Sequence, residues 1–259
     1  MIQVDHIYFR YHSEDNSPIN ILNDVSLEIR AGERIAIMGR NGSGKTTFAR
    51  CLNGLLLPSS GVVRVDGLTT SEAKNLADIR RHVGMVFQNP DNQIVSATVE
   101  REVAFGLENL GVPFEEMHEI VERMLFIFNL EKLRKQPPHQ LSGGEKQRLA
   151  LASVMAMHPK YLVLDEPTSL LDPKSRREVL ERISTLPQDT ENPVATLLIT
   201  QFPEEALYAN RLIVFHQGKI IMDDAPDELF SRHKELEAYG LEVPVKFQIA
   251  EFIIKYLQS

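Results

Sequence analysis

Residues 39–46 have the spacing G-x-x-x-x-G-K-[ST], a pattern that suits the binding of a phosphate chain. Glycines allow backbone N–H groups to converge on phosphate oxygens at the start of a helix, where the helix dipole favours negative charge. Lys45 would add a positive charge at the β- and γ-phosphates, and Thr46 would offer its hydroxyl to Mg²⁺. The residues expected to bind nucleotide in this phosphate loop are Gly39, Arg40, Asn41, Gly42, Ser43, Gly44, Lys45, Thr46 and Thr47.

Two carboxylates, Asp165 and Glu166, follow an apolar run at residues 161–164. At the end of a strand, Asp165 could hold a hydrated Mg²⁺ ion beside a phosphate chain. Glu166 points to the other side of the strand, because successive side chains alternate across the pleat. Carboxylates at strand ends are also common on protein surfaces, so the pair gains meaning only from the motifs around it.

A second glycine-containing segment, Ser142-Gly143-Gly144, stands at the expected start of a helix. A serine followed by two glycines can form an anion-binding nest from backbone N–H groups. An ordinary capped helix would have the same residues. A single nucleotide hardly needs two such nests from one chain.

Alternating strands and helices must position these residues. Residues 34–38 read as a buried strand that runs into the phosphate loop, and the apolar spacing after Thr46 predicts a helix. The residues from about 89 to 150 read as mainly helical, and a helix is expected from 173 to about 186. Other strands are expected at 4–9, 25–29, 83–87, 161–164, 195–199, 212–215 and 219–222. This alternation predicts an α/β fold with a mainly parallel sheet covered on both faces.

The composition of the 259 residues is that of a globular protein with a substantial core. No apolar run reaches the roughly 18 residues of a membrane-spanning helix, so a membrane role would need a partner. The start of the chain lacks the pattern of a secretory signal, and one cysteine, Cys51, permits no internal disulfide and fits a reducing cytoplasm. The net charge of −8 argues against nucleic acid as a partner.

Taken in this order along the chain, the phosphate loop, the segment 141–148 and the Asp165–Glu166 pair resemble the signature of the ATP-binding-cassette (ABC) ATPases. The resemblance implies a P-loop NTPase (RecA-like) cassette at residues 1–225, with ATP and Mg²⁺ as ligands. This cassette would contain an antiparallel β-subdomain and an inserted α-helical subdomain at about 89–150. Residues 226–259 would form a short C-terminal extension.

The same resemblance implies roles for single residues. Glu166 would be the general base that polarises the attacking water, and Gln88 would reach both Mg²⁺ and that water. The metal site would thus comprise Thr46, Gln88 and Asp165. Tyr11 is placed like the aromatic residue that stacks on adenine, although core packing explains a lone aromatic as well. In this family two cassettes form a head-to-tail dimer, and ATP binds between the phosphate loop of one and the Ser-Gly-Gly segment of the other.

The chain departs from the family pattern at Gln201, where these ATPases normally carry a histidine that contacts the γ-phosphate. A glutamine amide can donate a hydrogen bond, but it cannot carry a positive charge or relay a proton. Gln201 could act as a catalytic residue in a slower but active site. Alternatively, the chain could pair with a different cassette and leave one of the two composite sites weak.

Residues 87–95, with the sequence FQNPDNQIV, and residues 98–106 resemble the ATPases of energy-coupling-factor (ECF) importers and related cobalt and nickel uptake systems. The resemblance implies an ATPase bound at the cytoplasmic face of the membrane that powers uptake of vitamins or transition-metal ions. Its partners would be a second cassette, in a homodimer or a heterodimer, an integral membrane coupling (T) protein and a substrate-binding membrane (S) protein. Another ABC importer class and a non-transport ABC ATPase are the alternatives.

The tail at 235–245 and the amphipathic run at 247–257 resemble the C-terminal extension of these ATPases, which helps to hold two cassettes together. Its apolar residues suit either an interface between subunits or a contact with the core of the same chain. These residues are Phe247, Ile249, Ala250, Ile253 and Ile254.

Overall fold

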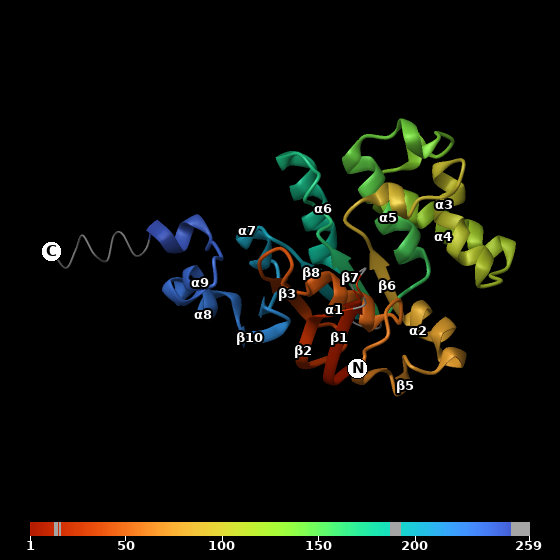
Figure 1. The fold of residues 1–259 in the computed structure, drawn as a ribbon. Helices are drawn as coiled ribbons and strands as arrows, with labels where there is room; N and C mark the ends of the chain where they lie inside the picture. The colour runs from red at the N-terminus through yellow and green to blue at the C-terminus, as the bar shows by residue number, and fades with distance from the viewer. Residues whose placement is uncertain (13–14, 16, 187–192, 250–259) are drawn as a thin grey trace.

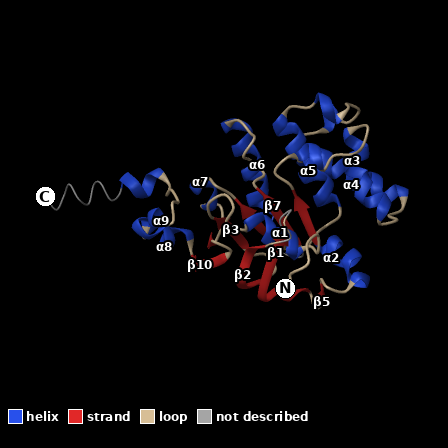
Figure 2. Ribbon diagram, in the orientation of Figure 1, coloured by secondary structure: helices blue, strands red, loops and turns tan. Residues whose placement is uncertain are grey.

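The computed structural model describes residues 1–12, 15, 17–186 and 193–249. Two β-sheets lie at the centre, with helices around them (Figure 2). The larger sheet has six strands in the order β10-β9-β3-β8-β7-β6, and the smaller has four in the order β2-β1-β4-β5. None of the helices in the described ranges is long and apolar enough to cross a membrane.

The larger sheet is parallel except at one edge. Its strands are β3 (Arg34–Met38), β6 (Val83–Val86), β7 (Tyr161–Asp165), β8 (Ala195–Ile199), β9 (Arg211–His216) and β10 (Lys219–Asp224). Only β10 runs antiparallel to its neighbour, β9, to which a two-residue turn joins it. The predicted mainly parallel sheet is confirmed.

The smaller sheet is antiparallel, because β1 pairs in that direction with both β2 and β4. Its strands are β1 (Ile2–His12), β2 (Pro18–Ile29), β4 (Ser60–Val65) and β5 (Leu68–Thr69). The strands expected at 4–9 and 25–29 both lie in this sheet. It forms the antiparallel β-subdomain that the family resemblance implies.

The helices lie mainly around the larger sheet, and the smaller sheet is at the rim of the molecule (Figure 1). They are α1 (Lys45–Leu52), α2 (Leu76–His82), α3 (Val99–Asn109), α4 (Phe114–Ile127), α5 (Gly143–Ala156), α6 (Pro173–Thr185), α7 (Pro203–Ala206), α8 (Pro226–Ser231) and α9 (His233–Ala238). Short 3₁₀ helices are η1 (Ala73–Asn75), η2 (Pro90–Asn92), η3 (Glu131–Leu133) and η4 (Pro138–Gln140).

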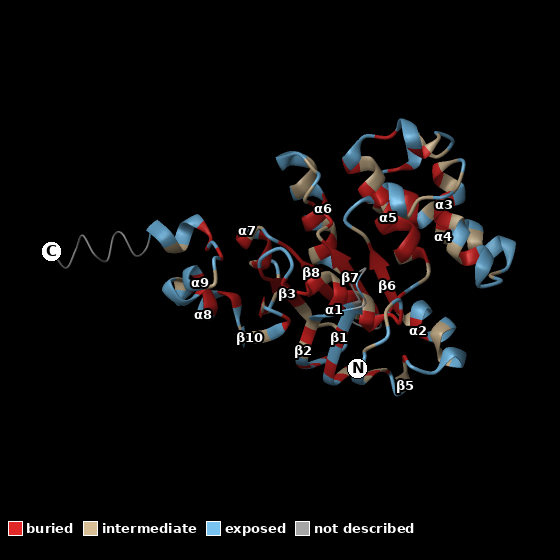
Figure 3. Ribbon diagram, viewed as in Figure 1, coloured by how far each residue is buried: buried red, intermediate tan, exposed pale blue. Residues whose placement is uncertain are grey.

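The two faces of the larger sheet belong to different cores. Tyr161 and Val163 of β7 pack in the core that includes α1 and the smaller sheet. Leu162 and Leu164, which alternate with them, pack in a second core with α3, α4, α5 and α6. All five residues of β7 are buried, as expected for a parallel strand covered on both faces (Figure 3). The helical subdomain therefore covers one face of the sheet at its β6–β7–β8 side.

The C-terminal extension covers the remaining part of this face, on the far side of the molecule from α3 and α4 (Figure 1). A third core joins Ala36 and Met38 of β3 to Leu229, Phe230 and Leu236 of the extension. The ring of Phe247 also packs here, with its centroid 5.5 Å from that of Phe230.

The contact of Phe247 is thus with its own chain, one of the two alternatives that the sequence left open. Ile249 is 53% exposed. Ala250, Ile253 and Ile254 lie outside the described residues, so a role of the tail in holding two cassettes together stays a prediction.

Candidate functional site

The phosphate loop leaves the end of β3 and leads directly into α1. At Gly39 a Cβ atom would stand 2.4 Å from the carbonyl oxygen of Phe215 and 2.7 Å from Ser43 Oγ. A side chain there would force the loop away from the sheet, so the close approach requires glycine. Gly44 precedes the helix with a φ of 105°, a left-handed conformation that residues with a Cβ atom rarely adopt.

Lys45 is the first residue of α1 and is only 5% exposed. Its ammonium group donates hydrogen bonds to the carbonyl oxygens of Gly39, at 2.6 Å, and Arg40, at 3.1 Å. Burial lowers the pKa of Lys45, and the carboxylates of Glu166 and Asp165 oppose this shift. The loop therefore already holds a cation at the position where a phosphate chain would bind.

Ser43 Oγ is buried and has no hydrogen-bond partner within the described part of the chain. A buried hydroxyl without a partner costs about 1–3 kcal/mol. A phosphate oxygen in the loop would satisfy this group, so the residues present fit a nucleotide. Thr47, which follows the motif, is buried on α1. Asn41 and Gly42 are exposed at the tip of the loop.

Two of the three expected Mg²⁺ ligands meet at the carboxyl end of β7, whereas the third, Gln88, donates to Glu166. Thr46 Oγ1 donates a hydrogen bond of 2.9 Å to Asp165 Oδ1. Asp165 is 4% exposed, and burial raises its pKa, while the hydrogen bond from Thr46 lowers it. A hydroxyl and a carboxylate at this distance are hard oxygen donors of the kind that Mg²⁺ prefers, so the pair fits this ion.

Glu166 stands beside this pair and receives hydrogen bonds from two amide side chains. Gln201 Nε2 donates to both of its carboxylate oxygens, at 2.8 and 2.9 Å, and Gln88 Nε2 donates to Oε2 at 3.1 Å. The backbone of Glu166 has a φ of 50°, which is unusual for a residue with a side chain. The structure therefore brings together all three residues that the sequence proposed as catalytic.

Ser169 is a neighbour of this site that the sequence analysis did not identify. Its hydroxyl lies 3.2 Å from Gln88 Nε2 and donates to the carbonyl oxygen of Glu166 at 3.0 Å. The only sequence signal was its place in the segment 167–172, which follows the two carboxylates. Nothing in that run distinguished Ser169 from an ordinary loop serine.

The Ser-Gly-Gly segment begins α5 with a capping box. Ser142 accepts a hydrogen bond from the backbone N–H of Glu145, whose side chain accepts one from the N–H of Ser142 at 2.7 Å. At Gly144 a Cβ atom would stand 2.7 Å from Ser175 Oγ of α6. Ser142 and Gly143 are exposed, and among the described residues no hydrogen bond joins the segment to the phosphate loop of its own chain.

Tyr11 lies on β1, is 40% exposed and packs edge-on against Phe9, with 4.9 Å between ring centroids. It is paired with Ile19 of β2. The carbonyl oxygen of Ile21, two residues further along β2, lies 2.9 Å from where a Cβ atom of Gly44 would be. Tyr11 therefore borders the strand that contacts the phosphate loop, and its contact with adenine stays a prediction.

The segment after Gln88 forms a capped turn. The side chain of Asn89 accepts a hydrogen bond from the backbone N–H of Asp91 at 3.0 Å, at the start of η2. Asp91 in turn accepts a hydrogen bond of 2.7 Å from Lys146 Nζ of α5. The turn thus joins the segment that carries Gln88, just after β6, to the helix that begins with the Ser-Gly-Gly segment.

A six-stranded, mainly parallel sheet with a phosphate loop between β3 and α1 is the arrangement of the P-loop nucleotide-binding proteins. The family model described as ABC transporter matches residues 22–169. The chain is 45% identical to the energy-coupling factor transporter ATP-binding protein EcfA1 of Clostridium perfringens, over 96% of this chain and 89% of that protein. It is 46% identical to EcfA1 of Bacillus subtilis, over 98% of this chain and 88% of that protein.

Solved structures agree with this assignment. CbiO1 of Clostridium perfringens, described as part of the ABC transporter complex cbiONQ, superposes with a TM-score of 0.79 at 32% identity, covering 96% of this chain and 98% of that one. The ATP-binding cassette MJ0796, in a dimeric post-hydrolysis state bound to ADP and Pi, gives a TM-score of 0.79 at 27% identity, covering 87% and 99%. The chain therefore belongs to the ABC transporter ATPases and, within them, to the energy-coupling factor ATP-binding proteins.

Proposed function

We propose that this chain is the ATP-hydrolysing subunit of an ECF-type importer and works at the cytoplasmic face of the membrane. The transported substrate would be a vitamin or a transition-metal ion. The names of the relatives support the transport role. The observation that carries the chemistry is the Glu166 carboxylate, which two amides hold beside the Thr46–Asp165 pair.

In this proposal the phosphate loop binds the β- and γ-phosphates of ATP through its backbone N–H groups and Lys45. Thr46, Asp165 and Gln88 would hold Mg²⁺, which when bound neutralises charge on the phosphate oxygens. Glu166 accepts a proton from the water that attacks the γ-phosphorus, and ADP and phosphate are the products. The amide of Gln201 keeps the carboxylate of Glu166 turned toward that water.

Replacing the base tests this assignment. Glu166→Gln keeps the size of the side chain and removes its basicity, so we expect ATP turnover to be abolished, with at least a 100-fold loss. Binding of ATP should persist, because the phosphate loop is unchanged. Phosphate release and equilibrium nucleotide binding would be measured on the same preparation, and full turnover in this variant would refute the base assignment.

We also propose that ATP binds between two cassettes, as the exposure of Ser142 and Gly143 allows. The second cassette would supply its Ser-Gly-Gly segment to the phosphate loop of the first. The dimeric MJ0796 cassette supports such an assembly. A homodimer would place Gln201 in both sites, whereas a heterodimer with a histidine-containing cassette would have two unequal sites.

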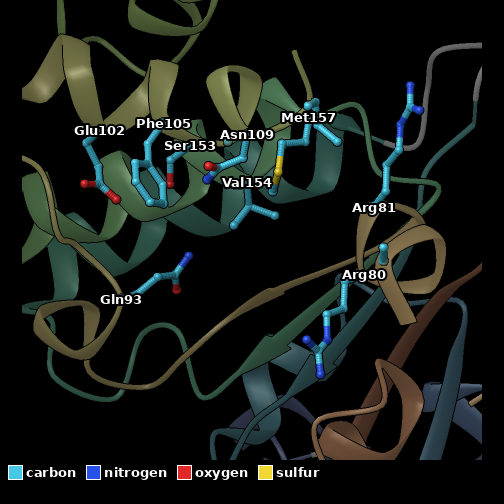
Figure 4. Close-up of a pocket in the computed structure, with 12 residues that line it drawn as sticks. Arg80, Arg81, Gln93, Glu102, Phe105, Asn109, Ser153, Val154 and Met157 are labelled. Carbon is cyan, nitrogen blue, oxygen red and sulfur yellow. The ribbon is translucent and has the colours of Figure 1, made fainter. Parts of the chain in front are cut away.

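A groove between α2 and the helical subdomain supports a membrane partner. It has a volume of about 340 Å³ and lies between α2 on one side and α3 and α5 on the other (Figure 4). Phe105, Leu110, Val154 and Met157 make one wall apolar. Gln93, four residues after the turn at Asn89, also lines it. We propose that this groove receives a helix of the integral membrane T protein, which also binds the substrate-specific S protein.

Co-purification from the native host tests this partner assignment. We expect the tagged chain to retain a membrane scaffold in mild detergent, and Phe105→Ser to lose it, because the groove loses its exposed ring. Phe114→Ser is the matched control, since Phe114 is 73% exposed on α4 and does not line the groove. Mass spectrometry would also show whether a second cassette co-purifies. Recovery of no membrane protein with the unaltered chain would overturn the transport role.

A further inference from the structure

A buried carboxylate, that of Glu205 on α7, lies behind the catalytic residues and takes no part in the chemistry described above. Glu205 is 1% exposed. Its two oxygens accept hydrogen bonds from two threonine hydroxyls, Thr168 Oγ1 at 2.5 Å and Thr200 Oγ1 at 2.6 Å. Burying a carboxylate costs free energy unless hydrogen bonds or an opposite charge offset it, and here the two hydroxyls supply hydrogen bonds.

The two threonines lie next to the residues proposed to be catalytic. Thr168 follows Glu166 by two positions, in the loop after β7, and Thr200 immediately precedes Gln201, in the loop after β8. The Glu205 carboxylate therefore connects the loop that carries the base with the loop that carries its amide partner. The same two loops are also joined by the hydrogen bonds that Gln201 donates to Glu166.

A third element supports the connection. Arg176 of α6 has its Nε 3.7 Å from Glu205 Oε1, and its guanidinium lies 3.7 Å from the ring centroid of Phe202. The backbone N–H of Phe202 donates to Thr200 Oγ1 at 3.0 Å. Burial raises the pKa of Glu205, while the hydrogen bonds from Thr168 and Thr200 and the charge of Arg176 lower it.

We infer that Glu205 is a positioning residue for ATP hydrolysis: through Thr168 and Thr200 it holds the Glu166 carboxylate and the Gln201 amide within hydrogen-bonding distance. The inference rests on the roles proposed for Glu166 and Gln201. Glu166 has the strained φ of 50°, which persists only where its surroundings enforce it. Without the connection, the backbone hydrogen bond from Glu166 N–H to the Ile199 carbonyl oxygen still joins the ends of β7 and β8, but the side chains beyond it lose a support, and a displacement of about 1 Å at a catalytic group can cost 100-fold in rate.

The threonine hydroxyls provide the test, because Thr→Val removes the hydrogen bond and keeps the shape. For Thr168→Val and Thr200→Val, in the complex purified with its native partners, we expect kcat to fall about 10- to 100-fold. The KM for ATP and the equilibrium affinity for ATP should stay within about twofold, since the phosphate loop is not touched. Thr168→Ser and Thr200→Ser restore the hydroxyl and should restore kcat.

A matched control is Thr70→Val, since Thr70 is as buried as Thr168, at 1% exposure, but lies at the end of the smaller sheet. It should leave kcat unchanged. Valine variants with full kcat would overturn the inference. So would a loss of kcat that serine does not restore, or one that follows a loss of ATP binding, because either indicates general damage to the fold.

Glu166→Gln, measured in parallel, separates this inference from the proposed function. If Glu166→Gln retains turnover, the base assignment fails, whatever the threonine variants do. If Glu166→Gln is inactive and both valine variants keep full kcat, the base assignment stands and the positioning role of Glu205 fails.

Discussion

Gln201 gives the Glu166 carboxylate two hydrogen bonds from a single amide nitrogen. A histidine at this position, as in the resembled family, would introduce a group that titrates near pH 6.5. An amide does not titrate, so Gln201 can donate its hydrogen bonds without itself taking up a proton. Gln88, in the loop after β6, donates to the same carboxylate, so side chains from two different loops orient Glu166.

Substitution of Gln201 should show how much this amide contributes. Gln201→Ala should lower kcat at least about tenfold, since hydrogen bonds to a charged group contribute roughly 1.5–3 kcal/mol each. Gln201→His should raise turnover and give the pH–rate profile an added ionisation near pH 6.5. Phosphate release from pH 5.5 to 8.5 is the measurement. An unchanged rate in Gln201→His would count against a catalytic deficit in the natural site.

At the scale of single elements, the start of α5 has two separate determinants. The capping box of Ser142 and Glu145 satisfies backbone groups that a helix start otherwise leaves unpaired. Gly144 then permits the close approach of Ser175, which is itself held by the Asp172 cap of α6. The orientation of the Ser-Gly-Gly segment therefore depends on α6 as well as on its own helix.

Removal of the Glu145 side chain should weaken the start of this helix. Glu145→Ala is expected to lower the free energy of unfolding by about 1 kcal/mol. The backbone N–H and the hydroxyl of Ser142 lower the pKa of Glu145 below its ordinary value of 4.5. The stabilisation from the charged form is thus fully present above about pH 4.5 and is lost as the pH falls below it.

Urea unfolding of the wild type, Glu145→Ala and Glu145→Gln at several pH values would measure this. Glu145→Gln keeps a hydrogen-bonding side chain without the charge. The difference between its free energy of unfolding and that of the wild type should therefore shrink as the solution becomes acidic. A difference from wild type that stays constant down to pH 3 would show that the charge of Glu145 contributes nothing.

At the scale of the whole molecule, the C-terminal extension completes the cover of the larger sheet. The helical subdomain packs on β6, β7 and β8, whereas α8 and α9 pack on β3 and β9. Gly240 also lies against the side chain of Arg40, because a Cβ atom there would stand 3.1 Å from Arg40 Cδ. The extension therefore contacts both the core of its own chain and the phosphate loop.

Truncation should separate the two possible roles of the extension. Removal of all residues after Pro226 should destabilise the single chain, because Leu229, Phe230 and Leu236 each stabilise it by roughly 1.5–3 kcal/mol of buried apolar surface. Removal of the residues after Gln248 should weaken the dimer. The thermal unfolding of the single chain should stay unchanged in this shorter truncation. Calorimetry and sedimentation would measure the two effects. A dimer of unchanged affinity in the shorter truncation would refute an interface at the tail.

The site residues that could be predicted from the sequence belong to short segments. The phosphate loop, the Asp165–Glu166 pair and the Ser-Gly-Gly helix start were found because their chemistry depends on residue types at fixed, close spacing. The strand–loop–helix order could be predicted for the same reason, since hydrophobic periodicity reports local secondary structure. The departure at Gln201 was visible only through the resemblance to the ABC ATPases, which places a histidine shortly after the buried strand at 195–199.

Residue types at close spacing were enough to predict phosphate binding and the parallel α/β class, and the resemblance to the ABC ATPases supplied the residues proposed to act on ATP. The three-dimensional fold was needed to show that Gln88 and Gln201 share the Glu166 carboxylate, that Glu205 connects the loops after β7 and β8, and that the extension packs on its own sheet. The physical reason is that these contacts join residues far apart in the chain. Their partners depend on strand order and on which face of the sheet each helix covers, and no local pattern encodes either.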